Sequence, residues 1–570
     1  MATQVDSRRL TGPNLVLAGA GATIDVDCTD DEREPLVRRW TEHARAMLDA
    51  VGWSDCGVAS RPVPTGVSLA FDAPIDALYA ACEIAEWAWE RATSNDETHD
   101  NAAFEAARER FVDTILEERN PAVLALRDAA EERGVPFLWD DDEVSVGSGQ
   151  RSKTWPAREC PDPKDVPWSE LGAIPIALVT GTNGKTTTVR LLAQIARAAG
   201  LCPGFSSTDG IWAGEEIVVT GDYSGPGGAR AVLRESKVDY AILETARGGL
   251  QRRGVGVEAA DVACVLNVSA DHLGEFGVAT VDDLTAIKFL ITKVVPPTGR
   301  VILNGDDPRV GGRRGEFAAE VALFSLDPHS SAIEEWRREK RPCAFLDGET
   351  LVLDRGGAPE AIIDAKEMPI AFGGAARHNL ANALAAILIA DATGIPTAAI
   401  RDGLSSFRPT PESLPGRTNL FEFDDVRVLV DFAHNPDGHA ALLDLAAQMP
   451  AKRRCVILGQ AGDRDNDSIV EMSRATVSAR PDRVFIKEMP RYLRGREAGN
   501  VPKLIQSVFD ERSFTEYEHH DTELDAVRAA LEWARPGDLL LFPIHESRAD
   551  VVEILEGRVR GGAHPTGPGD

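Results

Sequence analysis

The stretch IPIALVTGTNGKTTTVRLLAQIARAAG, residues 174–200, decides the fold of this chain. Its apolar start, residues 174–179, predicts a buried strand of a parallel sheet. The run breaks at the glycine-containing turn of residues 180–184, and apolar positions then recur at helical spacing from Lys185 onwards. Gly200 stands where such a helix would end. The stretch therefore predicts a strand, a glycine turn and a helix in direct succession, as in an α/β fold.

The glycine turn resembles a phosphate-binding loop in composition. Backbone N–H groups and a helix N-terminus would converge on one point, which suits a phosphate chain. Lys185 would reach the terminal phosphates, and the Thr186 hydroxyl would ligate magnesium. The full pattern has a glycine five residues before Gly184, where this chain has Val179, and a structural turn is the alternative. The residues predicted to bind a nucleotide are Gly181, Thr182, Asn183, Gly184, Lys185, Thr186 and Thr187.

Composition limits the class of protein. The 570 residues are enough for about three or four domains, and 43% apolar with 27% charged residues is ordinary for a globular protein. A net charge of −30 argues against nucleic-acid and anionic-membrane partners, although local basic clusters remain compatible with it. No segment has the length of a membrane span, and the N-terminus lacks the apolar core of a signal peptide. The eight scattered cysteines, without a CxxC pair, favour a reducing compartment. We therefore expect a cytoplasmic protein, and homo-oligomerisation stays open.

Changes in composition divide the chain into parts. Residues 1–150 combine two helical stretches with strand-like runs, which indicates a small α+β domain, and a long helix-prone segment covers residues 100–134. Residues 151–170 are rich in proline and charge and are predicted to be a linker. The phosphate loop belongs to a central domain, residues 171–410. In residues 411–570, strands are predicted at 427–431, 455–458, 483–487 and 538–542 with helices between them, which indicates a separate open-sheet domain.

Polar residues at predicted strand ends are candidates for a metal site. Glu244 follows an apolar strand, as the metal-binding acid of a phosphate-loop enzyme does, although a lone acid there is usually only a solvated strand end. Arg247 follows at a glycine-rich turn and could face a carboxylate or a phosphate. His272 follows the strand predicted at residues 262–268 and could ligate a second divalent ion, or it could be an ordinary loop histidine. The segment 205–223 is expected to form loops at the same edge.

Two residues on predicted helices have two interpretations each. In the helix predicted over residues 281–295, Lys288 falls inside the apolar arc, whereas Lys293 falls outside it. Lys288 either snorkels to water, or it is directed into the site and carries a carbamate that acts as an extra carboxylate. Asn379 precedes an alanine-rich helix, residues 380–390, where an amide either caps the helix or contacts an adenine edge.

The motifs together resemble the Mur ligase superfamily. Its own shortened phosphate loop matches GTNGKTTT, and further matches recur in the family's order: ADHLG at 270–274, AIK at 286–288, RHNLANALAA at 377–386, PGR at 415–417 and DFAHNPDG at 431–438. Within the superfamily, residues 172–555 resemble the Mur-like part of the cyanophycin synthetases, through stretches such as LETARGGLQRRG and FPIHESRA. RRLTGPN, residues 8–14, resembles the start of their first domain more weakly. The ATP-grasp domain of those enzymes is missing between the two parts.

The resemblance implies a fold and a reaction. The expected fold is α/β, with an N-terminal α+β domain, a central P-loop Mur ligase ATPase domain and a C-terminal Rossmann-like Mur ligase domain. The expected enzyme uses ATP and Mg²⁺ to activate a carboxylate as an acyl phosphate, which an amino acid or another amine then attacks. The metal ligands would be Thr186, Glu244, His272 and carbamylated Lys288, with Lys185, Glu244, His272 and Lys288 as the catalytic set. Asn379 would contact adenine, while Arg417 and Asp431 would hold the nucleotide from the C-terminal domain.

Two alternatives remain beside this interpretation. One is a ligase that acts on a folate-like or polyglutamate substrate, and only a substrate screen separates it. The other is a non-catalytic nucleotide switch with the same fold. Glu244, His272, Lys288 and Asp431 argue against the switch, because a switch needs neither a second-metal lysine nor a closing domain. The sequence leaves the identity of the amine and of the carboxylate acceptor open.

Overall fold

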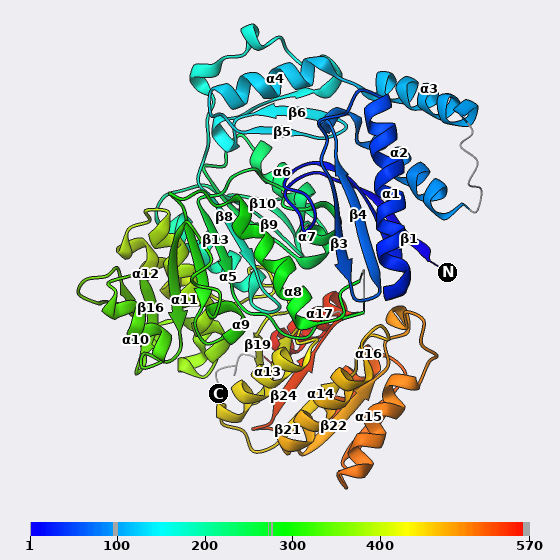
Figure 1. The fold of residues 1–570 in the computed structure, drawn as a ribbon. Coiled ribbons are helices and arrows are strands. Elements are labelled where there is room, and N and C mark those ends of the chain that lie inside the picture. The colour runs from blue at the N-terminus through cyan, green and yellow to red at the C-terminus, as the bar shows by residue number, and fades with distance from the viewer. Residues whose placement is uncertain (1, 95–100, 272, 275–276, 563–570) are drawn as a thin grey trace, which may run out of the picture.

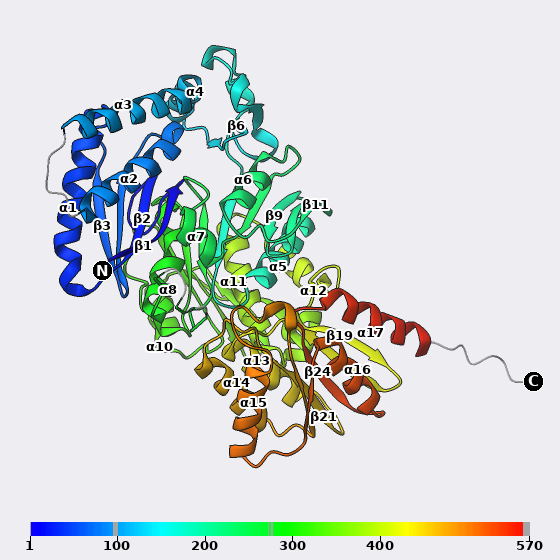
Figure 2. The ribbon, with the colours of Figure 1, turned by 90° about the vertical axis from the view of Figure 1, so that its right-hand side faces the viewer.

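The computed structural model describes residues 2–94, 101–271, 273–274 and 277–562. These residues form four sheets, of which the two largest are mainly parallel. In Figure 1 the N-terminal elements (blue) lie beside the central sheet, and the C-terminal sheet (yellow to red) lies below both. Figure 2 shows the same arrangement from the side, with α17 (Arg548–Gly562) at the margin of the molecule.

The central sheet has 11 strands in the order β11-β10-β9-β12-β8-β13-β14-β15-β16-β17-β18. It is parallel from β9 across to β16, and antiparallel strands finish both edges. Its strands are β8 (Ile176–Thr180), β9 (Pro203–Ser207), β10 (Gly210–Ala213), β11 (Glu216–Thr220), β12 (Tyr240–Glu244), β13 (Val262–Val265), β14 (Arg300–Asn304), β15 (Glu320–Ser325), β16 (Cys343–Asp347), β17 (Thr350–Asp354) and β18 (Glu360–Asp364).

The phosphate-loop strand β8 lies in the interior of this sheet. Leu178 pairs with Leu243 of β12 on one side, and Val179 pairs with Cys264 of β13 on the other. All residues of these three strands are buried, as expected for parallel strands with helices on both faces. One face packs against α5 (Lys185–Ala198), α11 (Arg377–Ala392) and α12 (Thr397–Ser406). The other packs against α6 (Pro226–Arg234), α7 (Arg247–Arg253), α8 (Val281–Lys288), α9 (Pro308–Gly311) and α10 (Ser331–Arg338).

The C-terminal sheet has 6 strands in the order β19-β20-β24-β21-β22-β23, and only β19 is antiparallel. The strands are β19 (Asn419–Phe423), β20 (Val426–Asp431), β21 (Arg454–Leu458), β22 (Arg483–Lys487), β23 (Tyr517–His520) and β24 (Leu539–Pro543). They alternate with α13 (Pro436–Gln448), α14 (Asn466–Ser478), α15 (Asn500–Glu511) and α16 (Glu523–Trp533). The strands predicted at residues 427–431, 455–458, 483–487 and 538–542 agree with this sheet to within one residue at each end.

The N-terminal part is an antiparallel sheet with helices on it. Its strands β1 (Thr3–Leu10), β2 (Gly21–Asp27), β3 (Val58–Val63) and β4 (Gly66–Asp72) follow the order β1-β2-β4-β3. Trp40 of α1 (Asp30–Ala50) is fully buried between the sheet and α2 (Leu78–Thr93). The helix-prone segment 100–134 forms two helices, α3 (Asn101–Glu118) and α4 (Pro121–Glu132). They separate at Pro121, which cannot donate an N–H within a helix, and the Asn120 side chain caps α4.

The segment predicted as a linker contains regular structure. Strand β7 (Lys153–Pro156) pairs with β6 (Glu143–Val146), which pairs with β5 (Phe137–Trp139). Val166 and Leu171 are buried against this small sheet. Proline and charge predicted the irregular turns here, but they gave no indication of the paired strand. The domain boundaries at residues 150, 170 and 410 stay predictions.

Two other local predictions differ from the structure. The expected loops of residues 205–223 include the hairpin strands β10 and β11, since these short strands lie between turns rich in glycine and hydroxyls and show no clear alternation. The helix predicted over 281–295 stops being α-helical at Lys288 and continues as a 3-10 helix, Phe289–Val294. There the Thr292 hydroxyl donates to the Phe289 carbonyl (2.7 Å), one of the local bonds that favour the tighter turn. Among the described residues, no helix has both the length and the apolar character required to cross a membrane.

Candidate functional site

A cavity of about 1450 Å³ lies where the carboxyl ends of the two large sheets face each other. The central sheet contributes the phosphate loop and the residues that follow β9, β12 and β13. The C-terminal sheet contributes residues at or just after the ends of β20, β21, β22 and β24, among them Asp431, Gln460, Met489 and His545. Ligands of open α/β sheets bind at this edge. The cavity is therefore where the predicted site residues should meet.

The phosphate loop is held by the neighbouring strand. Thr182 N donates to the Asn267 carbonyl (2.9 Å), and Asn183 N donates to the Asn267 side chain (2.8 Å). Gly184 has φ +87°, and a Cβ there would lie 2.2 Å from Asn382 Oδ1, so only glycine fits this position. Lys185 Nζ curls back to the carbonyls of Gly181 (2.9 Å) and Thr182 (3.0 Å). Thr187, the last predicted member of the loop, is buried in the first turn of α5 and lines the cavity.

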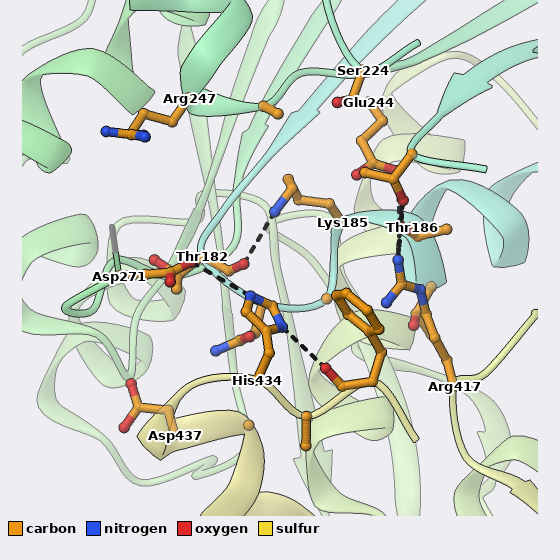
Figure 3. A pocket seen from close by; sticks show the side chains of 18 of the residues that line it. Thr182, Lys185, Thr186, Ser224, Glu244, Arg247, Asp271, Arg417, His434 and Asp437 are labelled. Atoms are coloured by element: carbon orange, nitrogen blue, oxygen red, sulfur yellow. Dashed lines mark hydrogen bonds and ion pairs between the residues drawn. The ribbon is translucent and has the colours of Figure 1, made fainter. Parts of the chain in front are cut away.

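A single hydroxyl joins the loop to two charged side chains (Figure 3). Thr186 Oγ1 donates to Glu244 Oε2 (2.8 Å) and accepts from Arg417 Nη2 (3.0 Å). Burial raises the pKa of Glu244 above its usual value, while Lys185 and Arg417 oppose that shift. The second carboxylate oxygen, Glu244 Oε1, is buried without a hydrogen-bond partner among the described residues. This orphaned oxygen beside a hydroxyl is a pair of hard donors, the kind that Mg²⁺ prefers.

Protein ligands alone do not complete a metal site here. Within the described residues, no group of three or more His, Cys, Asp and Glu side chains is arranged to hold a metal ion. Magnesium usually takes one or two carboxylates together with substrate phosphates and water, so Thr186 and Glu244 fit a nucleotide-bound ion. His272, the third predicted ligand, lies outside the described residues.

Lys288 is buried beside the loop and lines the cavity. It is 4% exposed at the end of α8, whereas Lys293 is exposed and donates to the Asn14 carbonyl (2.7 Å). Burial and the nearby Lys185 ammonium lower the pKa of Lys288 well below 10.5, although Asp271 acts in the opposite direction. A lysine in these surroundings favours the neutral amine.

Asn379, expected to contact adenine, lies near Arg417 and Asp431, which are expected to hold the nucleotide from the C-terminal domain. Arg417 also reaches Thr208 Oγ1 (3.1 Å), on the hairpin turn after β9. Asp431 accepts from Thr418 N (2.8 Å), and burial raises its pKa. Asn379 is 1% exposed and donates to the Ile370 carbonyl (3.1 Å), so its amide is tied to the backbone at the cavity wall.

Further contacts across the cavity were not predicted as site contacts. Asp271 accepts from Arg464 Nη1 (2.5 Å) and lies 3.6 Å from His434 Nε2, so it joins the central sheet to two C-terminal loops. Asn183 and Asn435 exchange side-chain hydrogen bonds (3.2 and 3.0 Å). Arg548 donates to Asp209 (3.1 Å). All of these residues follow strand ends, which is the one signal in the sequence that could have identified them.

Comparisons with known proteins agree with this architecture. The Mur ligase middle domain family matches residues 179–390, and the family described as Mur ligase, glutamate ligase domain matches residues 416–542. A cyanophycin synthetase from Synechocystis sp. is 36% identical over 425 residues, which are 73% of this chain and 48% of that protein. The chain thus spans about half the length of the cyanophycin synthetases it matches.

More distant relatives are also similar to this chain over about two thirds of its length. The UDP-N-acetylmuramoyl-L-alanyl-D-glutamate--2,6-diaminopimelate ligase of Listeria monocytogenes is 26% identical over 388 residues, 66% of this chain and 74% of that protein. Among solved structures, E. coli FolC in complex with DHPP and ADP is similar with a TM-score of 0.52 at 20% identity, over 67% of this chain and 89% of that one. A bifunctional folylpolyglutamate synthase/dihydrofolate synthase gives 0.51 at 22% identity, over 67% and 89% of the two chains. These likenesses confirm the predicted fold class.

Proposed function

Because the chain belongs to the Mur ligase family, we propose that it is an ATP-dependent amide ligase that couples a carboxylate to an amino acid or another amine. The two family matches together cover more than half of the chain. The observation that carries the proposal is the meeting of the phosphate loop, Glu244 and Arg417 at the Thr186 hydroxyl. The cavity of about 1450 Å³ also exceeds the range of roughly 300–1,000 Å³ usual for one small ligand, so it has room for more than a nucleotide.

The first half-reaction joins two anions. The substrate carboxylate attacks the γ-phosphoryl of ATP, the bond to the β-phosphate oxygen breaks, and an acyl phosphate and ADP form. Lys185 would leave its loop carbonyls to neutralise the phosphate charge, and the loop N–H groups would hold the phosphate oxygens. Thr186 and Glu244, together with His272, would hold a Mg²⁺ ion, which supplies charge neutralisation when it is bound.

Lys288 would support a second metal ion if it carries a carbamate. Its burial and lowered pKa support this assignment, because only a neutral amine adds carbon dioxide. The resulting carbamate would place a carboxylate-like group beside Lys185, where the two lysines otherwise repel each other.

The second half-reaction needs an amine and the exclusion of water. The amine attacks the acyl carbon, and phosphate leaves from the tetrahedral intermediate. Asn379, Arg417 and Asp431 would hold the nucleotide at the junction of the two sheets. The pairs Asp271–Arg464 and Asn183–Asn435 would keep the C-terminal sheet closed over the acyl phosphate.

The family likeness also suggests what the acceptor and the amine are. By its likeness to the Mur-like half of the cyanophycin synthetases, the chain would add one amino acid to a side-chain carboxylate of a preformed peptide. A folate-like or polyglutamate acceptor is the competing substrate class, which a screen of acceptors separates.

ADP release tests the proposal. Purified protein with ATP and Mg²⁺ should release ADP only when both an acceptor carboxylate and an amine are present, and mass spectrometry should find the amide. A screen of the amino acids against short Asp-containing peptides, glutamate peptides and folates identifies the pair. Nucleotide binding with no ADP release for any pair would favour the nucleotide-switch alternative.

A further inference from the structure

The C-terminal sheet contains a buried ion pair that the proposed reaction does not use. The side chains of Lys487, at the end of β22, and Glu523, at the start of α16, are both 0% exposed and form a short ionic contact. Desolvation makes such a pair a poor source of stability by itself. Its other bonds therefore indicate what it does.

Both side chains bind residues of loop 543–548, which begins at the last residue of β24. Lys487 Nζ donates to the Pro543 carbonyl (2.5 Å) and to His545 Nδ1 (3.1 Å). Glu523 accepts from three successive backbone N–H groups, those of His545 (2.9 Å), Glu546 (2.9 Å) and Ser547 (2.7 Å). A carboxylate that accepts three consecutive N–H groups fixes the course of the backbone at this turn.

The same network fixes the tautomer of His545. Because Nδ1 accepts from the Lys487 ammonium, the ring proton lies on Nε2, which donates to the Ala433 carbonyl (3.1 Å). Burial and the Lys487 charge lower the pKa of His545 well below 6.5, with His434 acting in the same direction and Glu523 opposing it. The neutral ring thereby ties the turn after β24 to the turn after β20.

The fixed segment also contacts other parts of the cavity wall. Glu546 lines the cavity and accepts from Arg491 N (2.8 Å), which belongs to the turn after β22. Arg548 donates to Asp209 (3.1 Å) of the central sheet and to the Pro415 carbonyl (3.3 Å). The phosphate-loop residues Lys185 and Thr186 belong to the central domain, and among the described residues neither forms a hydrogen bond with Lys487 or Glu523.

We propose that Lys487, Glu523 and His545 are positioning residues that hold loop 543–548, and with it the C-terminal wall of the cavity, in the geometry required for the amine step. The inference rests on the proposed ligase function. Its consequence is that the network affects the attack by the amine, while the binding of ATP depends on the phosphate loop together with Asn379, Arg417 and Asp431.

Single variants test this consequence. Glu523→Gln removes the charge and leaves one acceptor oxygen, so the KM for the amine should rise about 10- to 100-fold, the loss expected from misplacement of a reacting group. The KM for ATP should stay within about twofold, because its binding groups are untouched. Equal losses for ATP and amine would overturn the proposal.

A paired variant separates positioning from stability. Lys487→Met/Glu523→Gln removes both charges, so no buried charge is left without a partner. Its melting temperature should therefore be higher than that of Glu523→Gln alone. The amine KM should stay high, because glutamine cannot replace the carboxylate that gathers three N–H groups. Recovery of the amine KM together with the melting temperature would show a merely structural pair. Thr476→Val is the matched control, since this buried hydroxyl contacts His439 Nε2 (2.7 Å) and not the loop, and it should change neither KM.

Hydrogen exchange gives a readout that does not need activity. The N–H groups of residues 545–547 should exchange about tenfold or more faster in Glu523→Gln, while those of β24 stay protected. Unchanged exchange in the loop would overturn the positioning role whatever the reaction. If the wild type released no ADP with any amine while loop exchange still rose, the proposed function would fail and the positioning of the loop would stand.

Discussion

At the residue scale, the lysine of the phosphate loop acts through charge and not through packing. Among the described residues, Lys185 Nζ donates to carbonyls of its own loop, so Lys185→Ala should leave the fold intact and lower kcat by about 100-fold or more. Steady-state ADP release and a melting curve measure the two effects. Lys164→Ala is the control, because Lys164 is exposed and far from the cavity lining. Most of the activity surviving in a folded Lys185→Ala protein would remove the phosphate-loop assignment.

A variant of Lys288 tests whether this buried lysine takes part in the reaction or only packs in the core. Lys288→Ala should lose most of the activity, because a carbamate on the buried amine can no longer form, and added acetate should restore part of it by occupying the same space. Lys293→Ala, on the adjoining 3-10 helix, should keep normal rates. Wild-type rates in Lys288→Ala would leave only a packing role for this side chain.

The buried pair Lys487–Glu523 predicts how stability depends on pH. Burial opposes ionisation of Glu523, but the Lys487 ammonium and the backbone N–H groups outweigh it and hold the pKa of Glu523 below its usual 4.5. A depressed carboxyl pKa stabilises the fold above about pH 4.5, and this contribution is lost as the pH falls toward the folded pKa. Chemical denaturation between about pH 5 and pH 3 should therefore show a smaller loss in Glu523→Gln than in wild type. If the free energy of unfolding of the two proteins fell equally with pH, the lowered pKa of Glu523 would be contradicted.

The sequence predicted the site residues unevenly. Lys185, Thr186 and Glu244 could be named because a strand end or a glycine turn marks each of them locally. The partners of Asp271 could not, because Arg464 is 193 positions away and meets it only when two sheets pack face to face. Arg417 and Asp431 could be assigned only through the family resemblance, because their place in the site also depends on how the two sheets pack. Lys487 and Glu523 carry no local pattern that separates them from surface charges.

At the scale of elements, one arginine joins the phosphate-loop helix to the neighbouring hairpin. Arg190 of α5 is 5% exposed, and its guanidinium lies 3.7 Å from the Trp212 ring centre, beside Phe205. The hairpin turn carries Thr208 and Asp209 into the cavity.

Arg190→Lys keeps the charge but loses the planar stack, so the free energy of unfolding should fall by about 1–2 kcal/mol. Because the hairpin turn would shift, the KM for ATP should rise as well. Urea denaturation and ADP-release kinetics measure both, with the exposed Arg338→Lys of α10 as control. Unchanged stability would show that the stack contributes nothing.

Strands and helices were predictable where burial imposes a continuous apolar run or a helical period, as in β8, β12 and most of the C-terminal sheet. Hairpin strands β10 and β11 escaped prediction, because they are only four and five residues long, glycine-containing turns flank them, and β11 is largely exposed at the sheet edge. Strand β7 escaped because its pairing with β6, and not its own composition, makes it a strand.

At the scale of the whole molecule, the described residues bring one phosphate loop to the cavity between the large sheets, and from it we expect a single kind of coupling. We predict one ATP consumed per amide, with one type of amine accepted efficiently and a preformed acceptor required. Incubation with ATP, magnesium, aspartate, arginine and a short primer, followed by mass spectrometry, tests this. One amine mass per acceptor carboxylate is the expected product, and repeated addition of both amino acids would contradict it.

The cavity wall is less acidic than the molecule as a whole, whose net charge is −30. The wall combines the basic residues Lys185, Arg247, Arg252, Arg253, Arg417, Arg464, Arg494 and Arg548 with the acids Asp209, Asp222, Glu244, Asp271, Asp431, Asp437 and Glu546. An approaching nucleotide therefore meets a repulsive field at long range and an attractive one only near the mouth. Salt screens the distant charges first, since the Debye length is about 8 Å at physiological ionic strength. The association rate of the nucleotide should consequently increase when salt is first added, so the surface acts as a barrier that dissolved ions lower.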